Sequence, residues 1–488
     1  MNITPTIDEI KAYKDSGKYD ICPVSTEILS DFITPIEAMR VLKNVSTHTY
    51  MLESAFADEK WGRYTFLGCE PKLSISFFEG EANVNGETIS TPNPSEYLRN
   101  LMSGYRSPKI SKLPTFTGGL VGYFSFDYLY YSEPTAKRDV DDEEKFKDAD
   151  LMLFDKVIAF DNVKQKIVLI VNIKLDDYET NYANAINELK NMADLLRNGE
   201  KFKEPKSRLL SEVKPLFDKQ QYCDMVEKGK HYIKEGDIFQ IVLSNRLSAD
   251  YEGTLFDTYR VLRTINPSPY MFYFSGTDVE VAGASPETLV KLEDGVLHTF
   301  PLAGSRPRGK NEEEDKALIT ELLADEKELA EHNMLVDLGR NDLGRISEFG
   351  SVVVEDLRSV VKYSHIMHIA STVRGNIRND KDAFDAIEAV LPAGTLSGAP
   401  KIRACQLIGE LEGNKRGIYG GAIGYIDFTG NMDTCIGIRT AYKKNGKVFV
   451  RSGAGIVADS VPETEYQESI NKAQAVINAL KIAGEVEE

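Results

Sequence analysis

The sequence predicts an α+β protein in which β-hairpins form sheets and helices cover them. Three observations support this fold class. Residues 72–78 alternate as a strand does, and Asn85-Gly86 follows with the signal of a tight hairpin turn. Residues 182–197 have the apolar spacing of a helix that covers such hairpins. In the second half of the chain, long helices and strands alternate irregularly, without an internal repeat.

The first region contains further elements of this kind. Residues 8–13 are expected to form a short helix within a polar N-terminal stretch. Residues 117–124 predict a strand whose glycines allow another backbone to approach closely. Residues 151–160 and 166–174 are expected to be two more strands, joined by a turn at 161–163.

Residues 201–216 divide the chain into two regions. This stretch is charged, contains proline and lacks a clear hydrophobic period, as linkers do. We therefore expect an N-terminal α+β region over residues 1–200 and a larger second region over residues 217–488.

The second region begins with a readable order of elements. Residues 219–235 predict a helix, residues 236–246 a strand and residues 255–264 another helix. Residues 266–274 are a proline-rich turn that runs into a strand, and residues 363–373 have the β-branched, alternating composition of a strand.

Composition and charge exclude several classes of function. Hydrophobic residues make up 42% and charged residues 27%, which is ordinary for a globular protein. The chain has 58 Lys and Arg against 76 Asp and Glu, a formal net charge of −18 that argues against a nucleic-acid or anionic-membrane partner. An anionic small molecule stays compatible, because a local cluster of cations sets the field in a pocket.

The cysteines and the N-terminus indicate a compartment. Five cysteines are scattered without a Cys-x-x-Cys pair, so neither a disulfide framework nor a zinc site is predicted. The N-terminus lacks the apolar core of a signal peptide, and no apolar run reaches the roughly 18 residues that span a bilayer. We expect a cytoplasmic protein that does not bind membranes.

Two pairs of acids form the central hypothesis. A helix is predicted up to about residue 338, and Glu328 and Glu331 stand one turn apart on it. Its apolar face is formed by Leu322, Leu323, Leu329, Met334, Leu335 and Leu338. Glu465 and Glu468 form a similar pair near the C-terminus. Two such helices could hold one Mg²⁺ ion, although two solvated helix faces would show the same spacing.

Residues 453–458 match the glycine pattern of dinucleotide-binding loops. That pattern needs a helix opening on the glycines, but residues 459–462 intervene and the next helix begins near Glu463. We therefore expect a glycine-rich turn whose backbone N–H groups bind a carboxylate, and not a site for NAD.

Histidines and a basic loop are further candidates. His365 and His368 are three apart in a predicted strand and face opposite sides, so they are not expected to bind one metal. A single histidine in a pocket suits acid–base chemistry near neutral pH, and a structural role is the alternative. The loop at 300–310 carries three cations and is either solvated or binds an anion.

These stretches together resemble the chorismate-utilising enzymes, most closely the large subunits of anthranilate synthases. The matching segments occur in the order found in that family and cover nearly the whole chain beyond residue 20. They are residues 52–55, 266–274, 284–288, 301–309, 328–345, 364–375, 391–401, 420–427, 433–440 and 452–472. The resemblance implies two β-sheets packed face to face with helices on the outside.

The resemblance also implies a site. Glu331 and Glu468 would bind Mg²⁺, and Glu328 and Glu465 would lie behind them, supporting these ligands or acting through a bound water. The metal would hold the ring carboxylate of chorismate and draw electron density from the ring. The remaining residues expected to contact substrate are Gly304, Ser305, Tyr419, Arg439, Gly453, Ala454, Gly455 and Lys472. Of these, Tyr419, Arg439 and the backbone of 453–455 would take the enolpyruvyl carboxylate.

The implied reaction adds ammonia at C2, expels the C4 hydroxyl and then eliminates pyruvate to give anthranilate. His368 would be the general acid that protonates the departing hydroxyl, and Thr395 a nearby polar support. Position 303 separates relatives within the family. Enzymes resembling aminodeoxychorismate, isochorismate or salicylate synthases usually have a lysine there, whereas this chain has Ala303, which is neither nucleophile nor base.

Partners and a regulator follow from the same resemblance. No segment resembles a glutaminase, so ammonia is expected from a separate glutamine amidotransferase subunit, anthranilate synthase component II, in a heterotetramer. Five residues resemble a site for L-tryptophan, the feedback inhibitor of this first step of tryptophan biosynthesis: Glu53, Ser54, Pro269, Tyr270 and Met271. A sheet contact between the two regions would explain the same segments.

Two other functions stay open. One is a sibling aminating enzyme, an aminodeoxychorismate or aminodeoxyisochorismate synthase. The other is a regulatory subunit that binds tryptophan without catalysis, which predicts no turnover and a Glu468→Ala variant that behaves as the parent does.

Overall fold

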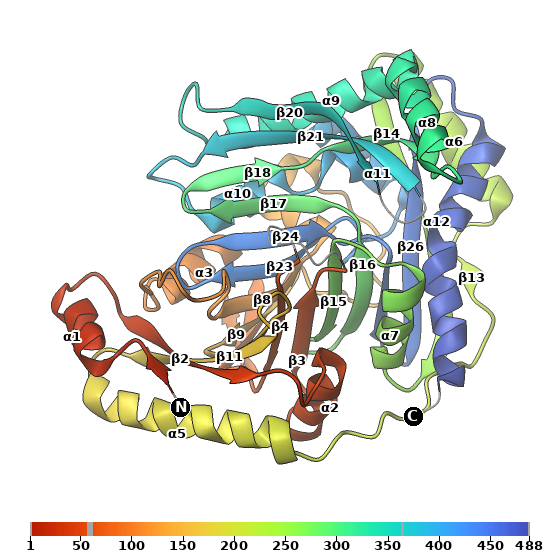
Figure 1. The fold of residues 1–488 in the computed structure, drawn as a ribbon. Helices are drawn as coiled ribbons and strands as arrows, with labels where there is room; N and C mark the ends of the chain where they lie inside the picture. Colours follow the sequence, from red (N-terminus) through yellow and green to blue (C-terminus); the bar gives the residue numbers. More distant parts are fainter. Residues whose placement is uncertain (1, 56–61, 363–365, 487–488) are drawn as a thin grey trace.

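Two antiparallel β-sheets, packed face to face, form the core of the computed structural model (Figure 1). The structure describes residues 2–55, 62–362 and 366–486. Over this part of the chain the first sheet has 14 strands and the second has 12. The predicted arrangement of two sheets with helices outside them is confirmed.

The first sheet draws on both ends of the chain. In spatial order it contains β1 (Ile3–Thr4), β2 (Ile21–Leu29), β11 (Lys166–Lys174), β10 (Lys156–Asp161), β4 (Tyr64–Cys69), β3 (Thr49–Glu53), β15 (Tyr270–Ser275), β16 (Glu280–Ser285), β25 (Thr440–Lys444), β26 (Lys447–Ile456), β14 (Gln240–Glu252) and β12 (Arg208–Leu209). Two short strands also pair with β14, namely β13 (Lys214–Pro215) and β22 (Gly398–Ala399).

The second sheet is built in the same way. Its spatial order is β19 (Leu302–Pro307), β21 (Ile366–Asn376), β18 (Val296–Thr299), β17 (Thr288–Glu293), β24 (Met432–Ile436), β23 (Ala422–Asp427), β8 (Gly119–Phe124), β9 (Ala149–Phe154), β5 (Leu73–Phe78), β6 (Glu81–Val84) and β7 (Glu87–Ser90). β20 (Val353–Lys362) pairs with β21.

Helices cover the outer faces of both sheets (Figure 1). The first sheet packs against α1 (Ile7–Asp15), α2 (Pro35–Val45), α5 (Tyr178–Asn198), α7 (Phe256–Ile265) and α12 (Pro462–Ile482). The second packs against α3 (Pro94–Met102), α9 (Glu326–Gly344) and α10 (Ala383–Val390). A further cluster joins α4 (Leu129–Ser132), α6 (Lys219–Lys234) and α11 (Lys401–Glu412) to β14 and β26. α8 (Glu312–Ala324) precedes α9, and η3 (Gly394–Leu396) precedes α11.

Aromatic side chains fill the space between the sheets. Tyr50 of the first sheet meets Phe154 of the second with 4.6 Å between ring centroids, and Phe66 meets Tyr425 at 6.0 Å. Buried rings of this kind combine a large apolar area with a preferred edge-to-face geometry. The two sheets are therefore fixed to each other by an aromatic core.

The two predicted regions share both sheets. β3 of the first region pairs with β15 of the second, and β8 pairs with β23. Residues 201–216 include β12 and β13, which both add to β14. The stretches of sequence before and after the predicted linker therefore contribute neighbouring strands to the same two sheets.

Most local predictions are confirmed. Asn85 and Gly86 both have positive φ, 50° and 93°, between the paired strands β6 and β7, as a two-residue hairpin turn requires. The helices predicted at 182–197, 219–235 and 255–264 correspond to α5, α6 and α7.

Among the described residues, no helix combines the length and the apolar character needed to cross a membrane.

Two local predictions are wrong. The single strand expected over 151–160 is β9 and β10, which belong to different sheets and change over at Asp155. Both strands are buried, so the apolar run shows no sign of the change. The helix expected up to about residue 338 continues to Gly344, and Leu322 and Leu323 belong to α8 instead. Asp325 starts the new helix by accepting hydrogen bonds from the N–H groups of the first turn.

Candidate functional site

Two loops that cross from one sheet to the other form the centre of the candidate site. One joins β16 to β17 and carries Glu287; the other joins β24 to β25 and carries Arg439. The loops are hydrogen-bonded at both ends: Ile436 N donates to Glu287 O (3.0 Å), and Ala284 N donates to Arg439 O (3.2 Å). A carboxylate and a guanidinium therefore meet where the two sheets join.

Glu287 is a functional candidate that sequence reasoning missed. Its Oε1 accepts a hydrogen bond of 3.1 Å from Thr395 Oγ1. Thr395, which is predicted to be a polar support at the site, therefore contacts this carboxyl group. Burial raises the pKa of Glu287 to about 7, against the opposing effects of Thr395, Arg439 and Lys472. Such a carboxyl can hold or release a proton near neutral pH. The available signal was an acid inside the matched segment 284–288.

His368 lies opposite Ser305 on the paired strands β21 and β19. Its Nδ1 is 3.0 Å from the carbonyl oxygen of Gly304, and since a carbonyl only accepts, Nδ1 carries the proton. Burial lowers the pKa of His368, and the charge of Arg439 lowers it further. The resting imidazole is thus neutral with Nε2 as an acceptor. His365 lies outside the described residues.

Gly304 brings an acid of α9 close to the histidine strand. Its φ is +64°, in the left-handed region, and the β19–β21 register shifts between Ala303 and Ser305. A Cβ atom at Gly304 would lie 3.0 Å from Glu328 Oε2. Ala303 beside it is buried, with 8% of its surface exposed. The predicted substrate-binding strand and the predicted acid helix are therefore in contact.

The four predicted acids form one electrostatic cluster between α9 and α12. Burial raises the pKa of Glu331, as do the negative charges of Glu328 and Glu468. The pKa of Glu465 is also raised, by burial and by the charge of Glu468. Glu331 and Glu468, which are 137 positions apart in the sequence (468 − 331), thus share one field, as the hypothesis of converging acid pairs requires.

Cations partly balance this cluster. Lys472 Nζ lies 2.6 Å from Glu468 Oε1 and donates to Gly453 O at 3.3 Å, while Arg306 pairs with Glu328 at 3.6 Å. Among the described residues, no three Asp, Glu, His or Cys side chains are arranged as metal ligands. Mg²⁺ needs only one or two protein carboxylates, because it keeps several waters. Mutual repulsion among the acids fits a site that a hard divalent cation would relieve.

The prediction of a glycine-rich turn at 453–455 is wrong. Gly453, Ala454 and Gly455 continue β26 and pair with β14, opposite Ser244, Leu243 and Val242. A Cβ at Gly453 would lie 2.3 Å from Leu243 O, so the glycine serves close strand pairing. Glycine in a sequence signals either a turn or a close approach, and here the second holds.

The strand geometry still leaves polar backbone groups at the site. Gly453 O accepts from Lys472, so it points away from β14. In an antiparallel ladder the N–H and C=O of one residue point to the same neighbouring strand. The N–H and C=O of the residue two positions further along point to that side as well. β25 ends its pairing with β26 at Val450. The N–H groups of Gly453 and Gly455 therefore face the edge where β25 has stopped, and their role in carboxylate binding stays a prediction.

Tyr419 and the basic loop complete the predicted residues. Tyr419 is 5% exposed, and burial raises its pKa to about 12. In the loop over 300–310, Arg306 pairs with Glu321 and Asp325 at 2.9 Å each, and Arg308 pairs with Asp315 at 2.7 Å. The two arginines are thus bound to α8 and to the start of α9.

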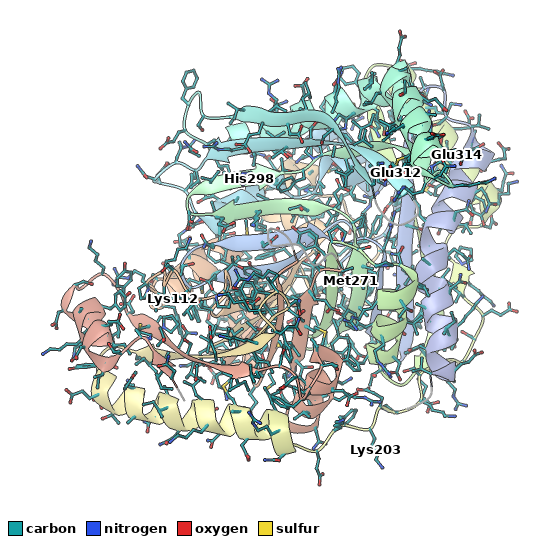
Figure 2. The ribbon with its side chains drawn as sticks, viewed as in Figure 1. Lys112, Lys203, Met271, His298, Glu312 and Glu314 are labelled. Carbon is teal, nitrogen blue, oxygen red and sulfur yellow. The ribbon has the colours of Figure 1, made fainter. Side chains whose placement is uncertain are left out.

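A separate cavity of about 940 Å³ lies between the sheets. Its wall includes Lys112, Met271 and His298, which Figure 2 labels. All five residues predicted to bind tryptophan line it: Glu53, Ser54, Pro269, Tyr270 and Met271. The predicted segments are therefore brought together by the pairing of β3 with β15.

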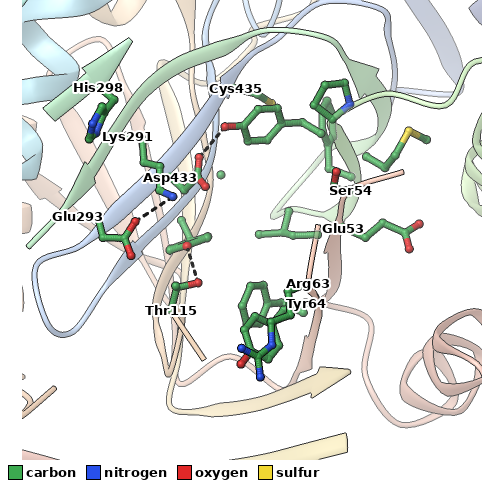
Figure 3. Close-up of a pocket in the computed structure, with 18 of the residues that line it drawn as sticks. Glu53, Ser54, Arg63, Tyr64, Thr115, Lys291, Glu293, His298, Asp433 and Cys435 are labelled. Carbon is green, nitrogen blue, oxygen red and sulfur yellow. Dashed lines mark hydrogen bonds and ion pairs between the residues drawn. The ribbon is translucent and has the colours of Figure 1, made fainter. Parts of the chain in front are cut away.

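Several charged side chains of this cavity are paired with neighbours. Glu53 points away from the other labelled residues in Figure 3, because it accepts hydrogen bonds from Tyr259 and Arg263 of α7. On the opposite wall, Lys291 pairs with Glu293 at 2.9 Å. Ion pairs thus fix side chains on both walls of the cavity. The apolar part of the lining is left for contact with a ligand.

Comparisons with known proteins relate the whole chain to one family. Residues 48–478 match the family model of the chorismate binding enzymes. Anthranilate synthase component 1 from Acetivibrio thermocellus is 44% identical, covering 99% of each chain. The crystal structure of anthranilate synthase component I from Streptococcus pneumoniae has a TM-score of 0.75 and 38% identity, covering 92% of this chain and 98% of that one.

A more distant structure shows the reach of the fold. The menaquinone-specific isochorismate synthase from Escherichia coli covers 98% of this chain and 99% of its own, with a TM-score of 0.70 and 19% identity. At that identity the likeness concerns the fold alone. The same pair of sheets is thus found in proteins whose sequences have diverged widely.

Proposed function

Because the chain belongs to the family of chorismate-binding enzymes, among the anthranilate synthase components 1, we propose that it converts chorismate and ammonia into anthranilate and pyruvate. The observation that carries the proposal is Ala303, buried beside Gly304 on the strand that faces His368. A methyl group there neither attacks the ring nor activates water. An external amine is therefore the nucleophile that the site favours.

Substrate binding is proposed to use both sides of the cluster. Arg439 and the backbone edge at Gly453 and Gly455 would hold the enolpyruvyl carboxylate, with Tyr419 nearby. Gly304 and Ser305 would contact the ring from β19. An arginine suits a carboxylate because its planar fork donates two parallel hydrogen bonds.

Proton transfer is proposed to involve one group that donates a proton and one that accepts a proton. Glu287, whose pKa is about 7, is partly protonated at neutral pH and can donate to the departing hydroxyl. His368 has a lowered pKa and carries its proton on Nδ1, so Nε2 is the ring nitrogen that would accept a proton. The earlier expectation that His368 is the general acid requires its protonation first. Titratable groups whose pKa values are perturbed by their surroundings are typical of catalytic sites.

Glu331 and Glu468 are proposed to hold Mg²⁺, with Glu328 and Glu465 as their supports. When bound, Mg²⁺ would anchor the ring carboxylate and stabilise the charge that develops as the ring loses its hydroxyl. Lys472, which pairs with Glu468, would orient this carboxylate.

The test is incubation of the purified chain with chorismate, MgCl₂ and an ammonium salt. Anthranilate fluorescence and stoichiometric pyruvate support the proposal. A non-aromatic amine product would point to an aminodeoxychorismate or aminodeoxyisochorismate synthase. Absence of turnover, in the parent and in Glu468→Ala alike, would point to a regulatory subunit. Mass spectrometry of the products separates the first two outcomes.

Regulation and assembly belong to the same proposal. L-Tryptophan is proposed to bind in the cavity lined by Ser54, Pro269 and Met271 and to inhibit the reaction, which requires unequal affinity for active and inactive states. A component II glutaminase is proposed to deliver ammonia. Glutamine-dependent activity should then appear when that subunit is added, while ammonium-dependent activity is present without it.

A further inference from the structure

We propose that Glu412, Arg416 and Arg451 form a buried positioning unit that holds three substrate-facing segments in register. The three side chains are 2–3% exposed. The inference rests on the proposed function, because it assigns to these residues the alignment of that site. No sequence signal of the site included them.

Glu412, at the end of α11, is the hub of the unit. Its carboxylate accepts five hydrogen bonds: two from the N–H and hydroxyl of Ser244 (2.7 and 2.9 Å), two from Arg416 (2.9 and 2.6 Å) and one from Arg451 (2.7 Å). Charge-assisted hydrogen bonds in a buried setting are strong and directional. The carboxylate is thus held from three different elements.

Arg416 connects the hub to two segments of the site. One terminal nitrogen donates to Leu396 O at 2.6 Å, next to Thr395, and the other donates to Val242 O at 2.7 Å. Its guanidinium also lies 5.7 Å from the ring centroid of Tyr419. A single planar group therefore fixes the η3 segment, which carries Thr395, and the loop that carries Tyr419.

Arg451 connects the hub to the third segment. It lies on β26, two residues before Gly453, and its Nε donates to Ser244 Oγ at 2.8 Å. Its NH1 donates to Asn414 Oδ1 (2.8 Å) and to Lys415 O (2.9 Å). The loop after α11 and the strand edge at Gly453 are thus tied to the same carboxylate.

Stability alone does not account for this arrangement. Buried ion pairs often contribute no more to stability than apolar residues of the same shape. What they supply is fixed direction, since every donor must meet its acceptor. Here each bond ends on a segment adjacent to Thr395, Tyr419 or Gly453, three positions widely spaced in the sequence. The geometry therefore favours alignment of the site as the role of the unit.

The mildest test is Ser244→Ala, which removes the hydroxyl between Glu412 and Arg451 and keeps the backbone bond. We expect the KM for chorismate to rise about fivefold with kcat within about twofold, because a strand edge that binds carboxylate is loosened. Calorimetric binding of chorismate without ammonia should show the same loss of affinity. Ser25→Ala is the matched control: Ser25 is equally buried and bonded to Thr4 O, but lies in β2, at the far side of the first sheet.

Arg416→Lys is the second variant. It keeps the charge but cannot reach Leu396 O, Val242 O and Glu412 together, so kcat/KM should fall by about tenfold or more. If both variants have lowered melting temperatures but bind chorismate as the parent does, the unit is structural and the inference is overturned. If Arg416→Lys does not fold, Ser244→Ala decides alone.

The outcomes for the parent keep the two proposals apart. A parent that neither binds chorismate nor forms anthranilate refutes the proposed function. A parent that does both, beside a Ser244→Ala variant with unchanged KM and affinity, refutes only the positioning unit.

Discussion

Replacement of Glu287 by glutamine should remove a proton donor and the pH dependence that comes with it. The carboxyl has a pKa of about 7 and is therefore protonated below that pH. If it protonates the departing hydroxyl, kcat/KM for chorismate must fall as the pH rises through 7, because the acid form is lost. Glutamine keeps the size and still accepts from Thr395, but it neither donates as an acid nor ionises.

The size of both effects follows from the pKa. The protonated fraction falls from about one half at pH 7 to about one hundredth at pH 9, so kcat/KM of the parent should fall about fiftyfold. A positioned acid contributes about 10²–10⁴ in rate, so Glu287→Gln should lose at least about a hundredfold at pH 7. Its remaining activity should vary little with pH over the same range.

The stability of the parent should also fall as the pH rises. Burial raises the pKa of Glu287 from 4.5 to about 7, so the folded state favours the protonated form. This contribution is fully present below pH 4.5 and is lost as the pH rises through 7, a change of about 3 kcal/mol at most. Glu287→Gln lacks this loss. Between pH 5 and pH 8 its free energy of unfolding should therefore fall less than that of the parent.

The assay is a pH series of anthranilate formation at a constant concentration of un-ionised ammonia, together with urea unfolding at pH 5 and pH 8. Un-ionised ammonia is held constant because ammonium also titrates in the alkaline range. Parallel pH profiles for the parent and Glu287→Gln would refute the role as acid. Equal changes in unfolding free energy would refute the raised pKa itself.

Four further substitutions test the rest of the site and the cavity. Arg439→Lys should raise the KM for chorismate about tenfold, since the bidentate geometry is lost, as steady-state kinetics would show. Glu331→Gln and Glu468→Gln should each raise the half-saturating Mg²⁺ concentration about tenfold or more in a metal titration. Arg263→Gln should remove the ion pair of Glu53 with α7, leaving the hydrogen bond from Tyr259, and weaken inhibition by tryptophan while the uninhibited rate stays the same. The concentration of tryptophan for half inhibition is the measurement.

The features of this structure that depend on neighbours in the chain could be predicted from the sequence. Periodicity and turn chemistry predict α5, α6 and α7 and the hairpin at Asn85-Gly86, because these depend on neighbours in the chain. The acid pairs were visible for the same reason: a spacing of three places Glu328 beside Glu331, and Glu465 beside Glu468, whatever the fold. That the pairs face each other was an inference, and the shared electrostatics of Glu331 and Glu468 agree with it.

What the sequence lacks is the information that depends on strand partners. Asp155 marks a change of sheet, but both strands are buried and apolar on either side of it. Gly453 resembles a turn glycine, yet the carbonyl of Leu243 on β14 is what excludes a side chain there. Glu287 carries no local signature either. Its raised pKa comes from burial at the junction of two sheets, which are assembled from both halves of the chain.

That junction also relates the proposed regulatory cavity to the site. Tyr270 lines the cavity, and its hydroxyl donates to Asp433 (2.8 Å) and lies 2.8 Å from Thr288 Oγ1. Thr288 follows Glu287 directly, and Asp433 lies on β24, the strand that leads into the loop of Arg439. A ligand that displaces Tyr270 would therefore act on both crossing loops at once. A ligand that bound without moving this hydroxyl would leave the loops in place, and by the requirement for unequal affinity it would not inhibit through this connection.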